Sequence, residues 1–407
     1  MHNKLCPAPF VSFYTGQYNK VSSCCAMKEA IGYSDKNKFE DIMNSDVAKG
    51  IRKSFLANKF PSECHACSKY EKETGHIAGM RQFNIDLTNN NFDFLRNVSP
   101  DGTLTKQEPV FLDLLFSNKC NFACMGCSGE LSNTIADKYS QAYDIVDTSG
   151  NQNRNWHNKS NVIDYILAHK DTIKKLHLNG GEPFMQEDVH ELLDVMLKHG
   201  LHHKIEIWSH TNGSIKKYKG VDVVEDYLKY WKKCSISLSS DGYGAQGEYV
   251  RYGSVAKKWE DTFYRLIDAD ILVDIQTCYN IFNSVNLLEL YNYYTEHLTA
   301  HWTGCLNINP WFDPQPFTAQ AAQLSPEVLE RANKQLDLVE EKINALSDKK
   351  GILWDIPALR STLNIKWNKE HCVEMKSKFQ RGIKMFDNLR KTNFIQTFPE
   401  LSTIYLN

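Results

Sequence analysis

Short hydrophobic runs alternate with amphipathic helical stretches from about residue 109 onward. The runs that predict strands are 110–116, 175–179, 204–209, 234–239, 273–277 and 306–309. Apolar residues at helical spacing predict helices near 130–141, 160–171, 187–199, 221–231, 256–268 and 286–298. Six successive strand–helix units are typical of an α/β fold, here a parallel sheet curled into a partial (βα)6 barrel. In such folds chemistry takes place at the carboxyl ends of the strands.

The two flanks of this region have different patterns. The first 80 residues are rich in cysteine and polar residues and carry only two short predicted helices, 39–44 and 47–56. The last part predicts longer helices over 326–347 and 366–391, and a polar stretch at 142–159 reads as an inserted loop. We therefore expect four parts: a small Cys-rich domain (1–80), a connector (81–108), the barrel (109–315) and a C-terminal helical segment (316–407).

Composition narrows the class of protein. Of 407 residues 42% are hydrophobic, which is enough for a buried core, and 47 basic residues nearly cancel 49 acidic ones. There is thus no general basic field for nucleic acid, and no apolar run is long enough to span a membrane. The amino terminus lacks the apolar run of a signal peptide, so we expect a cytoplasmic protein. Its 12 cysteines then indicate metal ligands or buried thiols rather than disulfides.

Three cysteines directly follow the first predicted strand. Cys120, Cys124 and Cys127 have the spacing Cys-x3-Cys-x2-Cys. Thiolates at this spacing can ligate three irons of a [4Fe–4S] cluster and leave the fourth iron open. The second strand ends in Gly-Gly-Glu-Pro at 180–183, where the glycines let a ligand approach the backbone and Glu182 offers a carboxylate to an amino group.

This combination resembles the radical S-adenosylmethionine (SAM) superfamily over roughly residues 109–312. The resemblance implies that the open iron binds SAM, and that one-electron cleavage of SAM yields a 5′-deoxyadenosyl radical, which abstracts a substrate hydrogen. It implies that the cysteines of the triplet are catalytic ligands and that SAM is bound by Gly180, Gly181, Glu182, Ser239, Asp241 and Asn280. Many members have an aromatic residue before the third cysteine, whereas this chain has Gly126, so adenine contacts must come from the backbone or from elsewhere.

The amino-terminal cysteines form a second candidate metal site. A Cys-x2-Cys pair with two earlier cysteines can close a four-ligand site, for zinc or for an iron–sulfur cluster. The order of motifs resembles the twitch or SPASM type of auxiliary-cluster domain, although such domains usually follow the barrel. This implies a second [4Fe–4S] cluster, for electron transfer or for structure. Its expected ligands are Cys6, Cys24, Cys64 and Cys67, with Cys25 as the alternative to Cys24.

The resemblance implies a cytoplasmic radical SAM enzyme of oxidoreductase type. Its reductant would be a flavodoxin or ferredoxin, and its substrate a peptide, a protein side chain or a small molecule. Two alternatives stay open, a non-catalytic zinc-binding interaction protein and an iron–sulfur electron carrier. The Gly-Gly-Glu-Pro segment argues against both, because neither needs it. No nucleic-acid module is evident.

Overall fold

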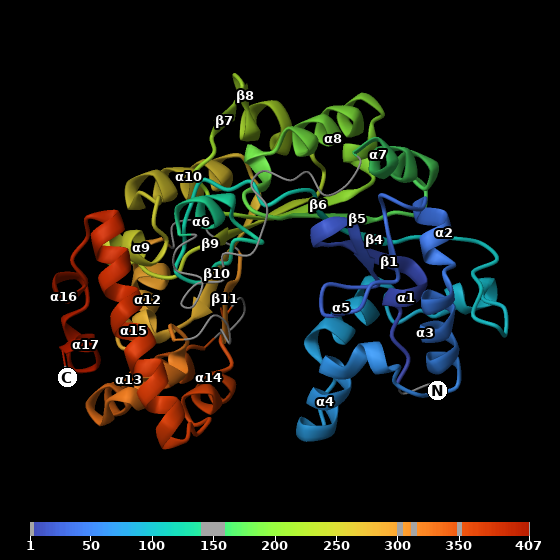
Figure 1. Cartoon of the computed structure of the whole chain (residues 1–407). Coiled ribbons are helices and arrows are strands. Elements are labelled where there is room, and N and C mark those ends of the chain that lie inside the picture. Colours follow the sequence, from blue (N-terminus) through green and yellow to red (C-terminus); the bar gives the residue numbers. More distant parts are fainter. Residues whose placement is uncertain (1–3, 140–158, 299–303, 311–315, 348–351, 407) are drawn as a thin grey trace. The chain divides into compact units, whose positions relative to one another are not determined.

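The computed structural model describes residues 4–139, 159–298, 304–310, 316–347 and 352–406 (Figure 1). The inserted loop expected at 142–159 lies outside these residues, except for its last residue. Contacts divide the chain into two compact units. The first unit comprises Met1–Ser117, Arg154–Ser209 and Tyr230–Cys234, and the second comprises Asn118–Asn153, His210–Lys229 and Ser235–Asn407.

The sheet of the first unit contains both predicted and unexpected strands. In spatial order its strands are β6 (Glu206–Thr211), β5 (Lys175–Asn179), β4 (Phe111–Leu115), β1 (Ser12–Thr15), β2 (Lys20–Ser22) and β3 (Gly32–Tyr33). The pairs β6–β5, β5–β4 and β4–β1 are parallel, whereas β1–β2 and β2–β3 are antiparallel. The predicted strands β4, β5 and β6 are confirmed. The cysteine-rich segment adds three further strands to the same sheet.

The register of these strands decides which side chains share a face. Asp113, His177 and Trp208 are direct partners on β4, β5 and β6, so they stand in one row on one face. Helix α5 (Gly79–Leu87) packs over this face, with the ring of Phe83 5.3 Å from that of Phe111. The opposite face carries leucines and is covered by two further helices, α2 (Phe39–Met43) and α7 (Lys159–Ala168).

Short helices complete the first unit (Figure 1). They are α1 (Ala8–Val11), α3 (Asp46–Leu56), α4 (His65–Thr74) and α8 (Glu187–Lys198). Ser45 caps α3, and Ile51 and Phe55 are buried on its inner side. The predicted helices 39–44, 47–56, 160–171 and 187–199 are confirmed. Most of helix α5 lies in the stretch predicted to be a connector, 81–108, and the domain boundaries stay predictions.

The second unit has its own parallel strands. These are β9 (Cys234–Ser239), β10 (Leu272–Tyr279), β11 (Leu306–Pro310) and β12 (Ile352–Leu353). Their helices include α6 (Asn133–Lys138), α9 (Gly244–Val250), α10 (Ala256–Asp268), α11 (Ile281–Ser284) and α12 (Leu287–Asn292). The helix predicted at 221–231 begins later, because β8 (Val221–Asp222) first pairs with β7 (Lys217–Tyr218) across a turn. Asp222 then caps a π-helical turn, Val223–Tyr227.

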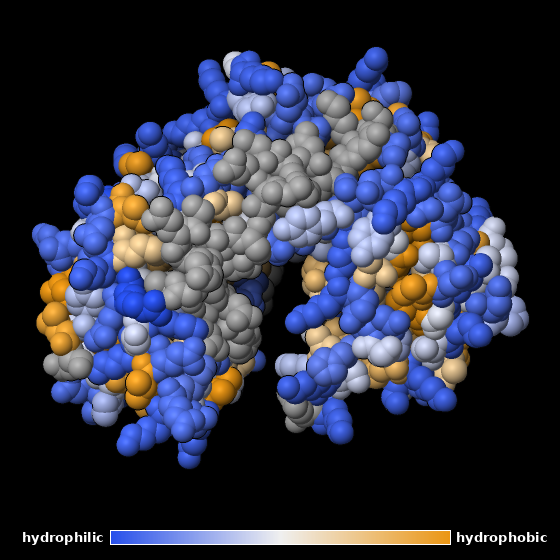
Figure 2. All heavy atoms as spheres, in the orientation of Figure 1, coloured by the Kyte–Doolittle hydropathy of each residue, from blue (hydrophilic) through white to orange (hydrophobic). Residues whose placement is uncertain are grey.

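The C-terminal segment is helical, as predicted. It contains α13 (Pro326–Asn344), α14 (Ile356–Leu363), α15 (Lys369–Arg390), α16 (Phe394–Thr397) and α17 (Ser402–Leu406). Phe379 of α15 packs against Phe317 and against Phe394 of α16 in an aromatic cluster. On the face that Figure 2 shows, hydrophobic residues occur in small separate groups. No helix among the described residues is long and apolar enough to cross a membrane. The α/β fold with a large, mostly parallel sheet is thus confirmed.

Candidate functional site

The cysteine triplet lies in the second unit, in the loop between residue 118 and helix α6. Cys120 is buried, and Cys124 and Cys127 are half-buried. Burial raises the pKa of Cys127 well above its usual range, and the nearby thiols of Cys124 and Cys120 raise it further. The three sulfur atoms are therefore close enough to interact electrostatically. Their proximity favours metal binding, because positively charged irons would offset the electrostatic repulsion between three neighbouring thiolates.

Backbone hydrogen bonds fix the shape of this loop. The N–H groups of Ala123 and Met125 donate to the carbonyls of Tyr252 and Val250, at 2.9 and 2.8 Å. The hydroxyl of Ser132, the N-cap of α6, donates to the carbonyl of Phe122 at 2.7 Å. The loop is thus held in shape by its neighbours.

Arg390, at the end of α15, also holds the loop. Its side chain is buried and donates to the carbonyl oxygens of Ala123 at 2.8 Å and Tyr249 at 3.3 Å, and to the hydroxyl of Tyr139 at 2.8 Å. The guanidinium also stacks on Phe386, 4.1 Å from the ring centroid. This residue links the C-terminal helix to the cysteine loop.

We expect Arg390→Met to loosen the loop. It retains the apolar bulk but leaves three buried acceptors without a donor, each costing about 1–3 kcal/mol. The free energy of unfolding of the metal-free protein, measured by urea titration, should fall by about 3 kcal/mol or more on that basis. Arg381→Met, on the same helix but exposed, is the matched control. Equal stability of the two variants would contradict the role of Arg390.

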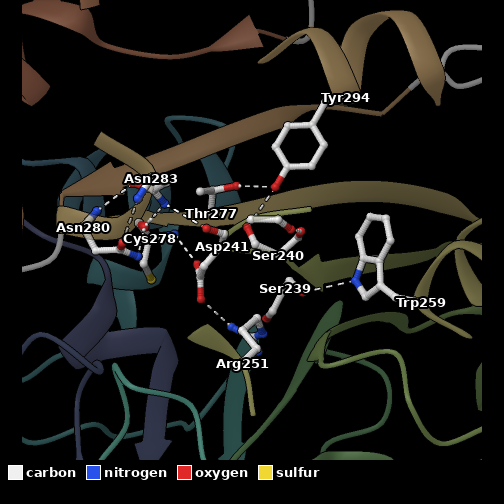
Figure 3. A network of polar contacts seen from close by, with 11 residues as sticks. Ser239, Ser240, Asp241, Arg251, Trp259, Thr277, Cys278, Asn280, Asn283 and Tyr294 are labelled. Atoms are coloured by element: carbon white, nitrogen blue, oxygen red, sulfur yellow. Dashed lines mark hydrogen bonds and ion pairs between the residues drawn. The ribbon is translucent and has the colours of Figure 1, made fainter. Parts of the chain in front are cut away.

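A buried polar network follows the ends of β9 and β10 (Figure 3). Asp241 accepts hydrogen bonds from Arg251 and from the backbone N–H of Cys278, both at 2.8 Å. Burial lowers the pKa of Arg251, but the neighbouring Cys124 and Asp241 raise it above its usual value, so the guanidinium stays charged. A fixed positive charge therefore lies near one cysteine of the triplet.

This network borders a pocket in the second unit. Ser239, Ser240, Arg251 and Trp259 are among its lining residues. In the described part of the chain, the buried Nε of Arg251 has no hydrogen-bond partner. Such an unsatisfied buried donor is costly unless a ligand accepts from it.

Three predicted SAM contacts, Ser239, Asp241 and Asn280, lie in or near this network and differ in their partners. Ser239 lines the pocket, whereas the carboxylate of Asp241 is engaged by Arg251 and Cys278. The side chain of Asn280 accepts from the N–H groups of Phe282 and Asn283 as the N-cap of α11. Asn280 therefore has a structural task that accounts for its position after β10.

The Gly-Gly-Glu-Pro segment lies in the first unit, at the end of β5. Gly180 has φ +128°, and a Cβ there would lie 2.8 Å from the carbonyl oxygen of Ser117. Only glycine fits this close approach. Glu182 is 0% exposed and accepts from the N–H of Phe184 at 3.3 Å, while Pro183 begins a short 3₁₀ helix. The turn is therefore tightly packed.

The structure brings the four predicted N-terminal ligands together. Cys6, Cys24, Cys64 and Cys67 line one cavity of the first unit. Burial raises the pKa of Cys64, and Cys6, Cys24 and Cys67 raise it further, so all four sulfurs are within electrostatic reach. Cys25 is exposed and is not among the cavity's lining residues. The geometry thus favours Cys24 over Cys25.

This preference gives a direct comparison. Cys24→Ser should remove the metal of the N-terminal site, because a cavity-lining thiolate is lost, whereas Cys25→Ser should retain it. Metal content per chain, measured on both variants after anaerobic loading, tests the assignment. Loss of metal in Cys25→Ser with retention in Cys24→Ser would reverse it.

Arg81 supplies the positive charge of this cavity. It lines the cavity, and its Nε and Nη2 donate to the two carboxylate oxygens of Glu71, both at 2.7 Å. A buried cation suits a site with four thiolates, whose net charge with iron or zinc is negative. No group of three or more His, Cys, Asp or Glu side chains in the described residues is placed to hold a metal ion as it stands.

A family model matches the centre of the chain. Residues 111–234 match Fer4_12, described as a 4Fe-4S single cluster domain. This match agrees with the [4Fe–4S] cluster that the sequence predicts at the cysteine triplet. The matched stretch contains both the cysteine triplet and the Gly-Gly-Glu-Pro segment. No curated protein matches the chain.

Several solved structures are similar to the chain. SuiB from Streptococcus suis bound to S-adenosylmethionine is 15% identical, with 74% of this chain and 60% of that chain covered and a TM-score of 0.41. Native anSMEcpe with bound AdoMet is 16% identical, with 60% and 63% covered and a TM-score of 0.39. TsrM from Kitasatospora setae, a radical S-adenosylmethionine methyltransferase, is 12% identical, with 53% and 39% covered and a TM-score of 0.36.

The chain spans less than two thirds of the length of the anSMEcpe structure and of this SuiB structure. TM-scores at this level add no weight to the site, which rests on the residues and on the family model.

Proposed function

We propose that the protein is a radical SAM enzyme with a second, N-terminal metal centre that is an iron–sulfur cluster. Cys120, Cys124 and Cys127 would hold the SAM-binding cluster. When bound, this cluster supplies the electron that cleaves SAM to methionine and a 5′-deoxyadenosyl radical, which removes a hydrogen atom from the substrate. The observation that carries the proposal is the cysteine loop, which the protein fixes in shape beside the charged side chain of Arg251.

The chain's own residues have distinct tasks in this proposal. Arg251 would donate to the SAM carboxylate through its unsatisfied Nε, and Ser239 would line the same pocket. Asp241 would act as a positioning residue, because it fixes the guanidinium at 2.8 Å. Gly180, Gly181 and Glu182 stay the candidates for the methionine amino group.

The N-terminal centre would be held by Cys6, Cys24, Cys64 and Cys67. Four thiolates leave no open position on a cluster, so this centre would transfer electrons or stabilise the fold rather than bind substrate. An oxidation that begins with hydrogen-atom removal must pass on one further electron, which such a centre can accept. A peptide or protein side chain remains our proposed substrate. Among the similar proteins, SuiB has been solved with the precursor peptide SuiA and anSMEcpe with the Cp18Cys peptide.

SAM affinity tests the proposed pocket. Arg251→Met should raise the Kd of SAM about tenfold or more, because a charge-assisted hydrogen bond contributes about 1.5–3 kcal/mol. The Kd of Arg251→Lys should lie between those of the wild type and Arg251→Met, because lysine retains the charge but not the planar donor geometry. Arg360→Met removes an ion-paired arginine of α14, outside the pocket, and is the control.

Calorimetric titration of the iron-loaded protein with SAM measures these constants, and circular dichroism checks that each variant is folded. A folded Arg251→Met protein with the wild-type Kd would refute the role of Arg251.

A further inference from the structure

A basic groove lies in the first unit, where β5 and β6 begin. It has a volume of about 490 Å³, and five lysines line it together with His202 and His203. The lysines are Lys174, Lys175, Lys204, Lys232 and Lys233. The chain as a whole has a net charge of −2, so this gathering of cations is local. We call these residues the basic groove.

Most of this charge is not neutralised within the groove. Its two acidic lining residues are Asp86 and Glu206, and Glu206 pairs with Lys175 at 2.8 Å, while Lys204 pairs with Asp171 at 3.3 Å. Lys174, Lys232 and Lys233 are exposed and make no ion pair with the described residues. Unpaired lysines in a concave surface attract and orient an anionic partner.

Helix α5 joins the basic groove to the N-terminal cysteine cavity. Met80 and Asn84 line the cavity, and Leu87 lines the groove. Met80 and Asn84 are four positions apart, and Asn84 and Leu87 three, so all three lie on one face of the helix. Asn84 is about one turn, roughly 5 Å along the axis, from Leu87. Helix α5 therefore forms part of the wall of both the cysteine cavity and the basic groove.

A row of side chains makes a second connection across the sheet. The ammonium of Lys175 lies 5.1 Å from the ring centroid of Trp208, which stacks on His177 with centroids 4.0 Å apart. Nδ1 of His177 is 2.8 Å from Oδ1 of Asp113. Asp113 in turn lies within electrostatic reach of Cys24. A packed path of side chains thus runs from the groove toward the cysteine cavity.

We propose that the basic groove docks an acidic one-electron carrier protein that exchanges electrons with the N-terminal metal centre. The inference rests on the proposed function, since it takes that centre to be an iron–sulfur cluster. One electron moves from the reduced centre to the oxidised carrier, and no bond forms or breaks. The path to the cysteines favours an electron carrier over a nucleic acid, because a nucleic acid would have no use for it.

Binding of an acidic [2Fe–2S] ferredoxin to the full, iron-loaded chain tests the docking surface. The triple variant Lys174→Gln, Lys232→Gln, Lys233→Gln should weaken binding about tenfold or more at low salt, and wild-type binding should weaken as salt rises. The control triple variant Lys366→Gln, Lys369→Gln, Lys384→Gln removes exposed lysines of the C-terminal segment and should bind as wild type.

Electron exchange gives a second readout. In the variant with alanine at Cys120, Cys124 and Cys127, only the N-terminal centre remains, and stopped-flow absorbance follows its oxidation by the ferredoxin. Adding Trp208→Leu should slow this transfer without changing the ferredoxin Kd, and Trp208→Phe, which retains a stacked ring, should restore it in part.

Three results would overturn the inference. The first is equal ferredoxin affinity of the groove and control variants, and the second is the absence of electron exchange with a bound ferredoxin. The third is tighter binding of single-stranded RNA or of an acidic peptide that the ferredoxin does not displace. SAM cleavage driven by dithionite bypasses docking and should be unchanged in the groove variant. Loss of dithionite-driven cleavage in the wild type would instead refute the proposed function.

Discussion

Replacing Cys124 with alanine is expected to abolish reductive cleavage of SAM, and so are Cys120→Ala and Cys127→Ala. Each thiolate would hold one iron, and the loop that carries them is held in shape by hydrogen bonds to the carbonyls of Tyr252 and Val250. The measurement is 5′-deoxyadenosine formed from SAM with dithionite as reductant.

The control for the triplet is Cys372→Ala, which removes a half-buried thiol of α15. It should leave cleavage unchanged. The N-terminal metal should also stay bound in all three triplet variants. Retained SAM cleavage in Cys124→Ala would contradict the assignment of the triplet.

The second large effect is expected in the N-terminal site. The double variant Cys64→Ala, Cys67→Ala should lose the second metal centre and make residues 1–80 susceptible to proteolysis. The cavity would keep Arg81 and its buried surroundings but lose two of its four ligands. Small segments with little core depend on such a metal for stability. Iron analysis should find about four irons per chain, the content of the remaining cluster.

The reciprocal variant separates the two centres. Alanine at Cys120, Cys124 and Cys127 together should also leave about four irons per chain. One zinc and no iron in this variant would make the N-terminal site a zinc site, and its proposed redox role would fall. Limited proteolysis of both variants shows which segment each metal stabilises.

The central sheet could be predicted because each strand is a short apolar run bounded by turn residues. Strands β4, β5, β9 and β10 all lie where the hydrophobic pattern places them. Strand β1 was missed because its end residues are Ser12 and Thr15. Their hydroxyls are buried and hydrogen-bonded, for example from Thr15 to the carbonyl of Leu115 at 3.4 Å, which a hydropathy pattern cannot show.

The cysteine ligands could be predicted because their spacing is local, but the arginines could not. Arg390 reaches Tyr139, a contact across 251 positions of sequence, and no local pattern signals it. Arg251 likewise could not be predicted, because its role depends on Asp241 and Cys124, which lie beside it only in the folded protein. Arg81 belongs to a helix in a stretch that looked like a connector. Asn280 shows a different ambiguity, because a polar residue after a strand is often a helix cap, and Asn280 caps α11.

One measurement tests the central claim most directly. The protein is purified and loaded with iron and sulfide without oxygen, reduced with dithionite and mixed with SAM, while iron, zinc and 5′-deoxyadenosine are quantified on the same sample. The account predicts about eight irons per chain, as two [4Fe–4S] clusters require, and 5′-deoxyadenosine that disappears in Cys124→Ala. Zinc without iron, or iron–sulfur clusters without any cleavage of SAM, would contradict it.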